Sequence, residues 1–185
     1  QGAEAIDFNT VDPVQAIDEL TRGLGPSRVV DAVGVDANRP HSGPASQEAD
    51  QKEQQFETQR KQVAPKTNEQ GDNWHPGDAP SQVATWAVQS VAKGGTLGII
   101  GVYPQTALFF PIGAAQEKQL KINMGNCNHR KYIPELIRMV ASGVVDPARV
   151  LTEREPVTSA IDAYKAFDER QPGWIKVKLE PTTSA

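Results

Sequence analysis

The sequence RVVDAVG at residues 28–34 has the β-branched content of a buried strand, and it ends in a glycine. Parallel strands often end so where the backbone turns near a ligand. Upstream, Asp12 followed by Pro13 is typical of the first positions of a helix. Residues 4–8 are predicted to form a short strand ahead of that helix. This order of strand, helix and strand predicts an α/β fold.

The same alternation returns after residue 80. Apolar residues at helical spacing predict a helix, and TLGIIGV at residues 96–102 predicts a second buried strand. A third strand is expected at residues 120–125, followed by an amphipathic helix. Thr158 is expected to cap a last helix, and residues 174–179 to form a closing strand. Four aromatic side chains are predicted to pack in the core: Trp86, Tyr164, Phe167 and Trp174.

Between the two halves, residues 35–80 are polar, and their large apolar residues are few: Val35, Phe56, Val63 and Trp74. Such a stretch is not expected to fill a core, and a structureless loop this long is improbable inside a compact domain. It is therefore predicted to be a surface insertion, partly helical over residues 47–62. Residues 1–34 would begin an α/β domain, and residues 81–185 would continue it and add a C-terminal segment.

Bulk properties narrow the class of partner. The chain has 185 residues and a formal net charge of −4, which argues against nucleic acid or an anionic membrane surface. No apolar run approaches the roughly 20 residues of a membrane span. The charge favours small molecules or protein partners instead. The single cysteine, Cys127, excludes an internal disulfide and favours a reducing compartment, so a cytoplasmic protein is expected.

Five segments, taken in order, resemble the medium-chain, zinc-dependent alcohol dehydrogenase family: VVDAVG, KGG, TLGIIGVYP, LKINMGNCNHRKYIPEL and PGWIKVKLEP. Within it, the glutathione-independent formaldehyde dehydrogenases and dismutases also carry a long polar insertion after DAVG, and residues 35–80 fit that place. The resemblance implies a doubly wound (Rossmann) parallel sheet that binds NAD or NADP. It also implies zinc in the parent enzyme, through residues absent from this chain.

The resemblance covers only the C-terminal part of the family's cofactor domain, with strands 3 to 6, a C-terminal helix and a closing strand. The strand order 3-2-1-4-5-6 of that fold would leave the strand at residues 4–8 without a neighbour and expose the edge of the strand at 28–34. An unpaired buried backbone is costly. We therefore expect the chain to be a fragment that is poorly stable or self-associating on its own, unless a companion chain supplies the missing half.

Ligands of a doubly wound sheet lie beyond the carboxyl ends of its strands. The candidate contacts there are Val33, Gly34, Gly101, Val102, Tyr103, Asn123, Gly125 and Asn126. By resemblance, Val33 and Val102 would pack near the nicotinamide ribose and ring, and backbone near Val102 and at residues 123–125 would orient the carboxamide. Lys176 would take the place of a basic residue that contacts pyrophosphate. No catalytic or metal-binding residue is assigned to this chain.

Each candidate has a structural alternative. Gly34 and Gly101 equally suit tight turns, and Lys176 equally suits a solvated position on a closing strand. Cys127 and His129 are two apart, but two ligands do not fill a tetrahedral zinc shell. Their loop could line the cofactor groove or a subunit contact, or it could be a turn in which Asn128 caps the next helix.

Two broader alternatives also stay open. The insertion is either an inert loop or a cover over the adenine end of the cofactor. The whole chain is either part of an alcohol or formaldehyde dehydrogenase that transfers hydride to or from nicotinamide, or a non-catalytic remnant that acts as a binding or assembly module. Residues 109–111 (FFP) are expected at a homo-oligomer contact along the sheet edge. The substrate cannot be predicted from these residues.

Overall fold

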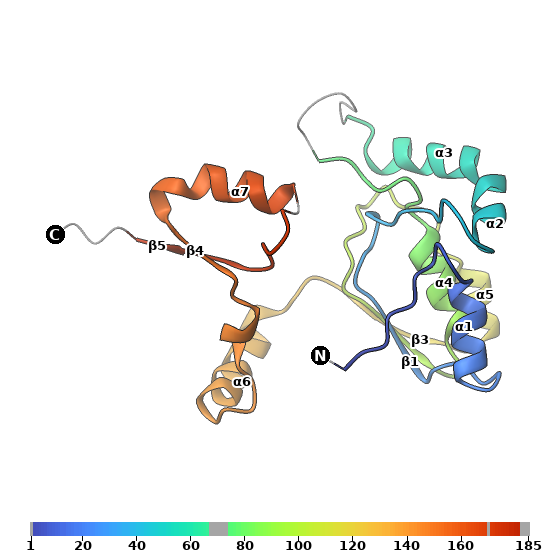
Figure 1. Ribbon diagram of the computed structural model, residues 1–185. Helices are drawn as coiled ribbons and strands as arrows, with labels where there is room; N and C mark the ends of the chain where they lie inside the picture. The colour runs from blue at the N-terminus through green and yellow to red at the C-terminus, as the bar shows by residue number, and fades with distance from the viewer. Residues whose placement is uncertain (1, 67–73, 170, 182–185) are drawn as a thin grey trace. The chain divides into compact units, whose positions relative to one another are not determined.

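The computed structural model describes residues 2–66, 74–169 and 171–181 (Figure 1). The chain divides into two compact units, Gln1–Asn126 and Cys127–Ala185, and each is described by itself. None of the helices in the described ranges has the length and apolar character needed to cross a membrane.

A three-stranded parallel sheet forms the centre of the first unit. Its strands are β1 (Arg28–Asp31), β2 (Thr96–Ile99) and β3 (Lys121–Met124), in the order β1-β2-β3. The register places Asp31 opposite Ile99 and Ile99 opposite Met124, so the three carboxyl ends lie at one edge. The predicted α/β fold with a parallel sheet is confirmed.

One face of this sheet is covered by helices. α4 (Gln82–Ser90) and α5 (Ile112–Glu117) pack there with β2, and the buried core comprises Ala87, Val88, Leu97, Ile99 and Ala115. Along β2, Leu97 and Ile99 are buried while the following Ile100 is exposed, as the period of two in a strand requires. α1 (Pro13–Leu20) packs against α4, and the carboxylate of Asp12 caps it by accepting hydrogen bonds from the Val14 and Gln15 amides.

Residues 4–8 do not form the predicted strand. The Asp7 carbonyl accepts hydrogen bonds from the amides of Thr10 and Val11, so the chain turns where that strand would have ended. Among the described residues, no neighbouring strand offers this segment a ladder of hydrogen bonds. Phe8 instead contacts the ring of Trp86, with the ring centroids 5.8 Å apart. The lack of a pairing partner explains why apolar content alone did not make a strand.

The polar insertion is helical, as predicted. It also has a small core, which was not predicted. α2 (Ser46–Gln51) and α3 (Glu53–Val63) confirm the expected helical content. Ala49, Phe56 and Ala79 form a buried cluster, and Val63 is also buried. The expectation that this stretch cannot fill a core was wrong, because alanines and one phenylalanine suffice for a core of this size.

The two ends of the insertion are hydrogen-bonded to each other, in a pairing that we call the neck. The Gly77 amide donates to the Val35 carbonyl at 3.0 Å, and the Ala79 amide donates to the Ala37 carbonyl at 2.9 Å. A β-carbon at Gly77 would lie only 2.1 Å from the Ala37 carbonyl oxygen, so glycine permits this approach. The neck fixes where the insertion leaves the first unit and where it returns.

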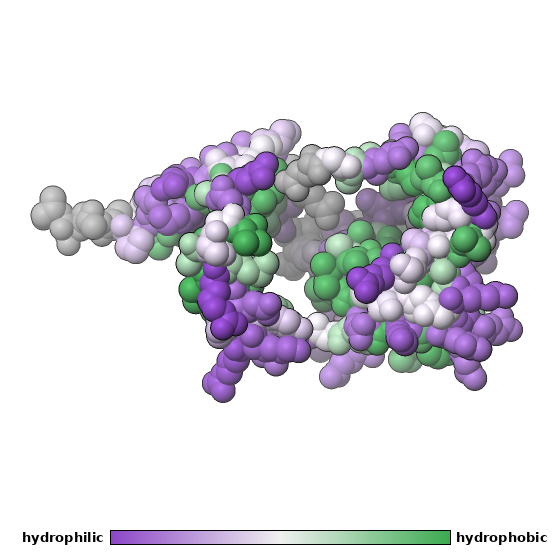
Figure 2. All heavy atoms as spheres, turned by 90° about the horizontal axis from the view of Figure 1, so that it is seen from below, coloured by the Kyte–Doolittle hydropathy of each residue, from purple (hydrophilic) through white to green (hydrophobic). Residues whose placement is uncertain are grey.

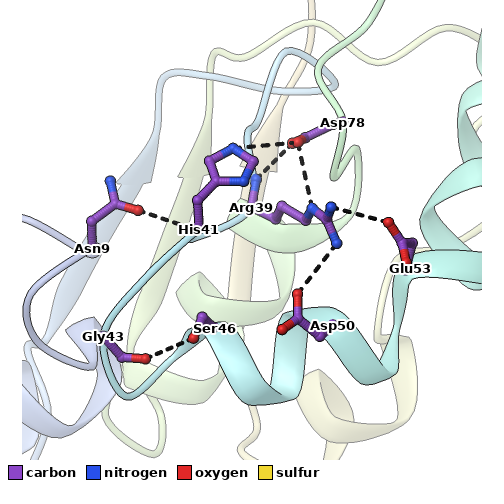
Figure 3. A network of polar contacts seen from close by, with 8 residues as sticks. All are labelled: Asn9, Arg39, His41, Gly43, Ser46, Asp50, Glu53 and Asp78. Atoms are coloured by element: carbon purple, nitrogen blue, oxygen red, sulfur yellow. Dashed lines mark hydrogen bonds and ion pairs between the residues drawn. The ribbon is translucent and has the colours of Figure 1, made fainter.

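Arg39 connects the helices of the insertion to the neck (Figure 3). Its guanidinium lies 3.4 Å from Asp50 of α2, 3.0 Å from Glu53 of α3 and 3.7 Å from Asp78. The Arg39 amide also donates to Asp78 at 2.7 Å, and the His41 ring lies 3.6 Å from the same carboxylate. One side chain thus contacts α2, α3 and the returning segment at Asp78 (Figure 3).

The second unit contains α6 (His129–Ala141), the 3₁₀ turns η1 (Pro147–Val150) and η2 (Val157–Ser159), α7 (Ala160–Asp168), and the parallel pair β4 (Glu153–Pro156) and β5 (Val177–Glu180). The helices agree with prediction, but Thr158 does not cap α7. It lies inside η2, and Ser159 precedes the helix without a side-chain capping bond. The sequence analysis did not predict β4, whose EREP sequence lacks the apolar residues of a typical strand.

Two of the four aromatic side chains predicted for the core are exposed instead. Tyr164 and Phe167 of α7 are 72% and 47% exposed, so the prediction that they are core residues was wrong for this chain. α6 also carries an exposed apolar stripe, formed by Ile133, Leu136, Ile137 and Val140. Hydrophobic residues are visible at the surface in Figure 2. Helical spacing predicted the apolar faces correctly, but the described chain does not bury them.

Candidate functional site

The candidate site lies beyond the carboxyl ends of β1, β2 and β3. Because the three strands are parallel and in register, the segments that follow them begin at the same edge of the sheet. These segments contain seven of the nine residues predicted to contact the cofactor, namely Val33, Gly34, Gly101, Val102, Tyr103, Gly125 and Asn126. An eighth, Asn123, lies within β3 itself, one residue before its last. The sheet therefore brings their backbones to one edge.

Two of these segments are joined directly through their backbones. Gly34 and Val102 form an isolated parallel bridge, and the Val35 amide donates to the Val102 carbonyl at 3.1 Å. A β-carbon at Gly34 would lie 2.4 Å from the Val102 amide nitrogen, and one at Gly101 would lie 2.3 Å from the Gly34 nitrogen. Both glycines are thus required for close backbone approach, whatever else they contact.

The carboxylate of Asp31 holds the turn after β1 and reaches the segment after β2. One carboxylate oxygen accepts hydrogen bonds from the amides of Val33 and Gly34, both at 2.9 Å. The other accepts from the Tyr103 hydroxyl at 2.6 Å. Asp31 is 1% exposed, and both of its oxygens have donors, which offsets the cost of burying a carboxylate.

The backbone of Asp31 adds a second connection. Its carbonyl accepts hydrogen bonds from the amides of Ile100 at 2.9 Å and Gly101 at 3.0 Å. Asp31 therefore contacts both strand-ending segments through its side chain and its main chain.

Tyr103 is held between this carboxylate and an aromatic side chain. Burial raises the pKa of Tyr103 well above its ordinary value, and the hydrogen bond to Asp31 and the charge of Asp31 raise it further. The ring meets that of Phe109 edge to face, with the centroids 6.4 Å apart. Phe110 packs against the core of the first unit. The dimer contact expected at residues 109–111 stays a prediction.

The edge of the sheet is open to a ligand. Val33 and Val102 are 44% and 75% exposed, although both are apolar. Asn123 and Gly125 are exposed as well, and a β-carbon built on Gly125 would meet no atom within 4 Å. An apolar surface next to accessible backbone suits the face and the carboxamide of a nicotinamide ring.

The remaining candidates lie in the second unit. Lys176 precedes β5, and its carbonyl accepts hydrogen bonds from the amides of Thr152 and Glu153. Cys127 is an exposed free thiol, and Asn128 caps α6 by accepting from the Lys131 amide at 3.2 Å, so the capping alternative for this loop is confirmed. Throughout the described ranges, no three His, Cys, Asp or Glu side chains gather as a metal site would require.

Asp31 is a residue of the candidate site that was not predicted from the sequence. The signal was present, since a single carboxylate interrupts the apolar run of residues 29–33. A charged residue that is fully buried in a strand has to be paired or hydrogen-bonded. Its partner Tyr103 is 72 positions away, so the sequence alone could not identify the pair.

Comparison with curated proteins indicates a family over about half of the chain. An uncharacterized zinc-type alcohol dehydrogenase-like protein of Bacillus subtilis is 35% identical over 95 residues, 51% of this chain and 25% of that protein. A zinc-type alcohol dehydrogenase-like protein of Schizosaccharomyces pombe is 31% identical over 105 residues, 57% of this chain and 25% of that protein. The matches thus span about a quarter of the length of these relatives. No family model matches the chain.

Solved structures share the fold over most of the chain. The alcohol dehydrogenase TADH from Thermus sp. ATN1 superposes with a TM-score of 0.63 at 23% identity, covering 97% of this chain and 39% of that one. A structure described as an NAD-dependent alcohol dehydrogenase gives a TM-score of 0.53 at 17% identity, covering 91% and 35%. The sheet and helices therefore match part of the alcohol dehydrogenase fold, in agreement with the predicted Rossmann-like class.

Proposed function

We propose that this chain forms part of the nicotinamide-binding surface of a zinc-type alcohol dehydrogenase. The observation that carries the proposal is the shared edge of β1, β2 and β3, where the exposed Val33 and Val102 lie on adjacent segments joined at Gly34. The likeness of about half the chain to zinc-type alcohol dehydrogenase-like proteins supports it. Ligands of doubly wound sheets bind at this edge.

In this proposal the residues of the chain position the cofactor. Val33 and Val102 pack against the nicotinamide ribose and ring and exclude water from one face. Backbone groups near Val102 and at residues 123–125 orient the carboxamide. The bound nicotinamide supplies hydride transfer to or from an alcohol or aldehyde. The described residues offer no donor set for zinc, so no step through a metal is assigned to them.

We place the parent enzyme in the formaldehyde dehydrogenase branch, with NAD as the default cofactor and the cytoplasm as its compartment. The support for this branch is the long insertion that follows the DAVG sequence. Assays with formaldehyde, with longer primary alcohols and with secondary alcohols, each with NAD and NADP, test the assignment. Turnover of secondary alcohols alone would contradict the assignment to this branch. It would not contradict the proposed cofactor surface.

Dinucleotide binding tests the central proposal. The protein as its gene encodes it is titrated with NADH and NADPH, and binding is followed by nicotinamide fluorescence. The variant Val102→Asp should bind at least about tenfold more weakly, because it places a carboxylate where an apolar ring face would pack. Leu24→Asp is the matched control, since Leu24 is 77% exposed and precedes the amino end of β1, at the opposite edge of the sheet.

Wild-type protein that binds neither dinucleotide would overturn the proposal. Equal weakening by Val102→Asp and Leu24→Asp would show that binding does not depend on the carboxyl edge.

A further inference from the structure

The hydrogen bonds of Asp31 have an unusual distribution for a buried strand residue. All three donors that its carboxylate receives belong to residues predicted to contact the cofactor, namely Val33, Gly34 and Tyr103. Its carbonyl receives the amide of a fourth, Gly101. The side chain therefore points along the strand toward the carboxyl edge and makes no hydrogen bond to the helices that cover the sheet.

We propose that Asp31 is a positioning residue for the nicotinamide end of a bound dinucleotide, which it serves by holding the segments after β1 and β2 in one arrangement. The inference rests on the function proposed above. Asp31 is buried and does not touch the ligand itself. It acts through Val33 and Val102, whose exposed side chains extend from the two segments that it joins.

The geometry explains why a carboxylate is suited to this role. Val33 and Gly34 present two backbone amides to one oxygen, and the other oxygen is free to accept the Tyr103 hydroxyl. An amide side chain keeps one acceptor but replaces the other with a donor, so it can hold the first turn and weaken the second connection. A hydrophobic side chain of similar size removes both acceptors and leaves three donors unpaired.

A positioning role and a purely stabilising role for Asp31 predict different effects on the binding of two ligands. NADH contains the nicotinamide, whereas ADP-ribose lacks it and carries the same adenosine diphosphate portion. If NADPH binds more tightly to the wild type, NADPH and 2′-phospho-ADP-ribose replace this pair. A residue that positions only the nicotinamide end changes binding of the first ligand and spares the second. A residue that merely stabilises the fold weakens both to the same extent.

The experiment measures both dissociation constants for Asp31→Leu, Asp31→Asn and Tyr103→Phe in the protein as its gene encodes it. Asp31→Leu should weaken NADH binding about tenfold or more and ADP-ribose binding less than about twofold. Tyr103→Phe should weaken NADH binding about three- to tenfold, because it removes the hydrogen bond from the segment after β2 to the Asp31 carboxylate. Asp31→Asn should retain NADH binding within about threefold, since it keeps an acceptor for both amides.

Asp12→Leu is the matched control. Asp12 also accepts two backbone amides, at 2.8 and 3.0 Å, but it caps α1 and precedes the amino end of β1 in the chain. The Asp12→Leu variant should lower the midpoint temperature of thermal unfolding and leave the ratio of the NADH and ADP-ribose dissociation constants unchanged.

Equal loss of NADH and ADP-ribose binding in Tyr103→Phe, or no loss of either, would overturn the inference and leave the proposed function standing. Should Asp31→Leu fail to fold, Tyr103→Phe decides the matter by the same ratio of dissociation constants. Wild-type protein that binds ADP-ribose but not NADH would overturn both the inference and the proposed nicotinamide surface.

Discussion

Tyr103 keeps its proton more tightly in the folded chain than an ordinary tyrosine does. Burial opposes the charged phenolate, and the neighbouring Asp31 opposes it further, so the pKa of Tyr103 is raised. Because the folded state binds this proton more tightly than the unfolded state, the group contributes stability below the unfolded pKa of about 10 and loses it as pH rises beyond that value.

The variant Tyr103→Phe should therefore show a smaller loss of stability between pH 8 and about pH 11 than the wild type. Phenylalanine cannot ionise, so the part of the alkaline destabilisation that comes from Tyr103 disappears. Urea unfolding followed by tryptophan fluorescence at several pH values measures the difference. Two parallel stability profiles would mean that Tyr103 ionises in the folded state without penalty.

At the residue scale, local signals were predictable and distant pairings were not. The caps at Asp12 and Asn128 involve amides two or three positions away, so their sequence context sufficed. The Asp31 and Tyr103 pair depends on how β1 and β2 are placed by the whole sheet. The strand ends that carry most of the candidate contacts were predicted because they are encoded locally, whereas Asp31, which joins two of them, was not predicted.

Arg39 is the feature that matters most at the scale of elements within the insertion. Its side chain is 22% exposed and lies against acidic residues of α2, α3 and the returning segment. Exposed ion pairs contribute little singly, but one guanidinium shared by three carboxylates orders three segments together.

Replacing Arg39 with methionine should open the insertion. We expect cleavage by a dilute protease between α2 and the end of α3 to become about five- to tenfold faster, because the segments lose a common partner and local opening becomes more frequent. Lys52→Met is the control, since Lys52 pairs with Glu48 one helical turn away. Cleavage that accelerates equally in both variants would show that helix propensity, and not the Arg39 contacts, limits opening.

The elements themselves show where sequence patterns fail. β1, β2 and β3 were predicted from their apolar and β-branched residues, and each has a neighbouring strand in the sheet. Residues 4–8 have comparable content but no partner, and β4 has a partner, β5, but a polar sequence. A segment forms a strand where a neighbouring backbone is available to pair with it, and the sequence of that segment alone does not show whether one is.

On the scale of the molecule, the described chain leaves large apolar side chains exposed in both units. Those of α6 form a stripe of four residues, and Val30, Ile100 and Met124 are exposed on or next to the strands of the first unit. Contiguous apolar surface of this kind is typical of contact sites. Its presence agrees with the expected tendency of the 185-residue chain to self-associate.

We expect the 185-residue chain, expressed alone, to show a weight-average mass that rises with concentration in sedimentation equilibrium. The double variant Leu136→Gln/Ile137→Lys should shift it toward the monomer, because it interrupts the α6 stripe. Gln116→Lys adds the same charge at an exposed position of α5 and serves as the control. A concentration-independent monomer mass for the unaltered chain would refute the expectation.

The neck has a consequence for how this fold tolerates change. Residues 35–37 are hydrogen-bonded to residues 77–79, so the segment between them forms a loop whose two ends are held together. Lengthening such a loop costs little chain entropy, because closure cost grows only with the logarithm of length. We therefore expect the fold to tolerate a reporter domain inserted after α3, with β1 and α4 keeping their positions.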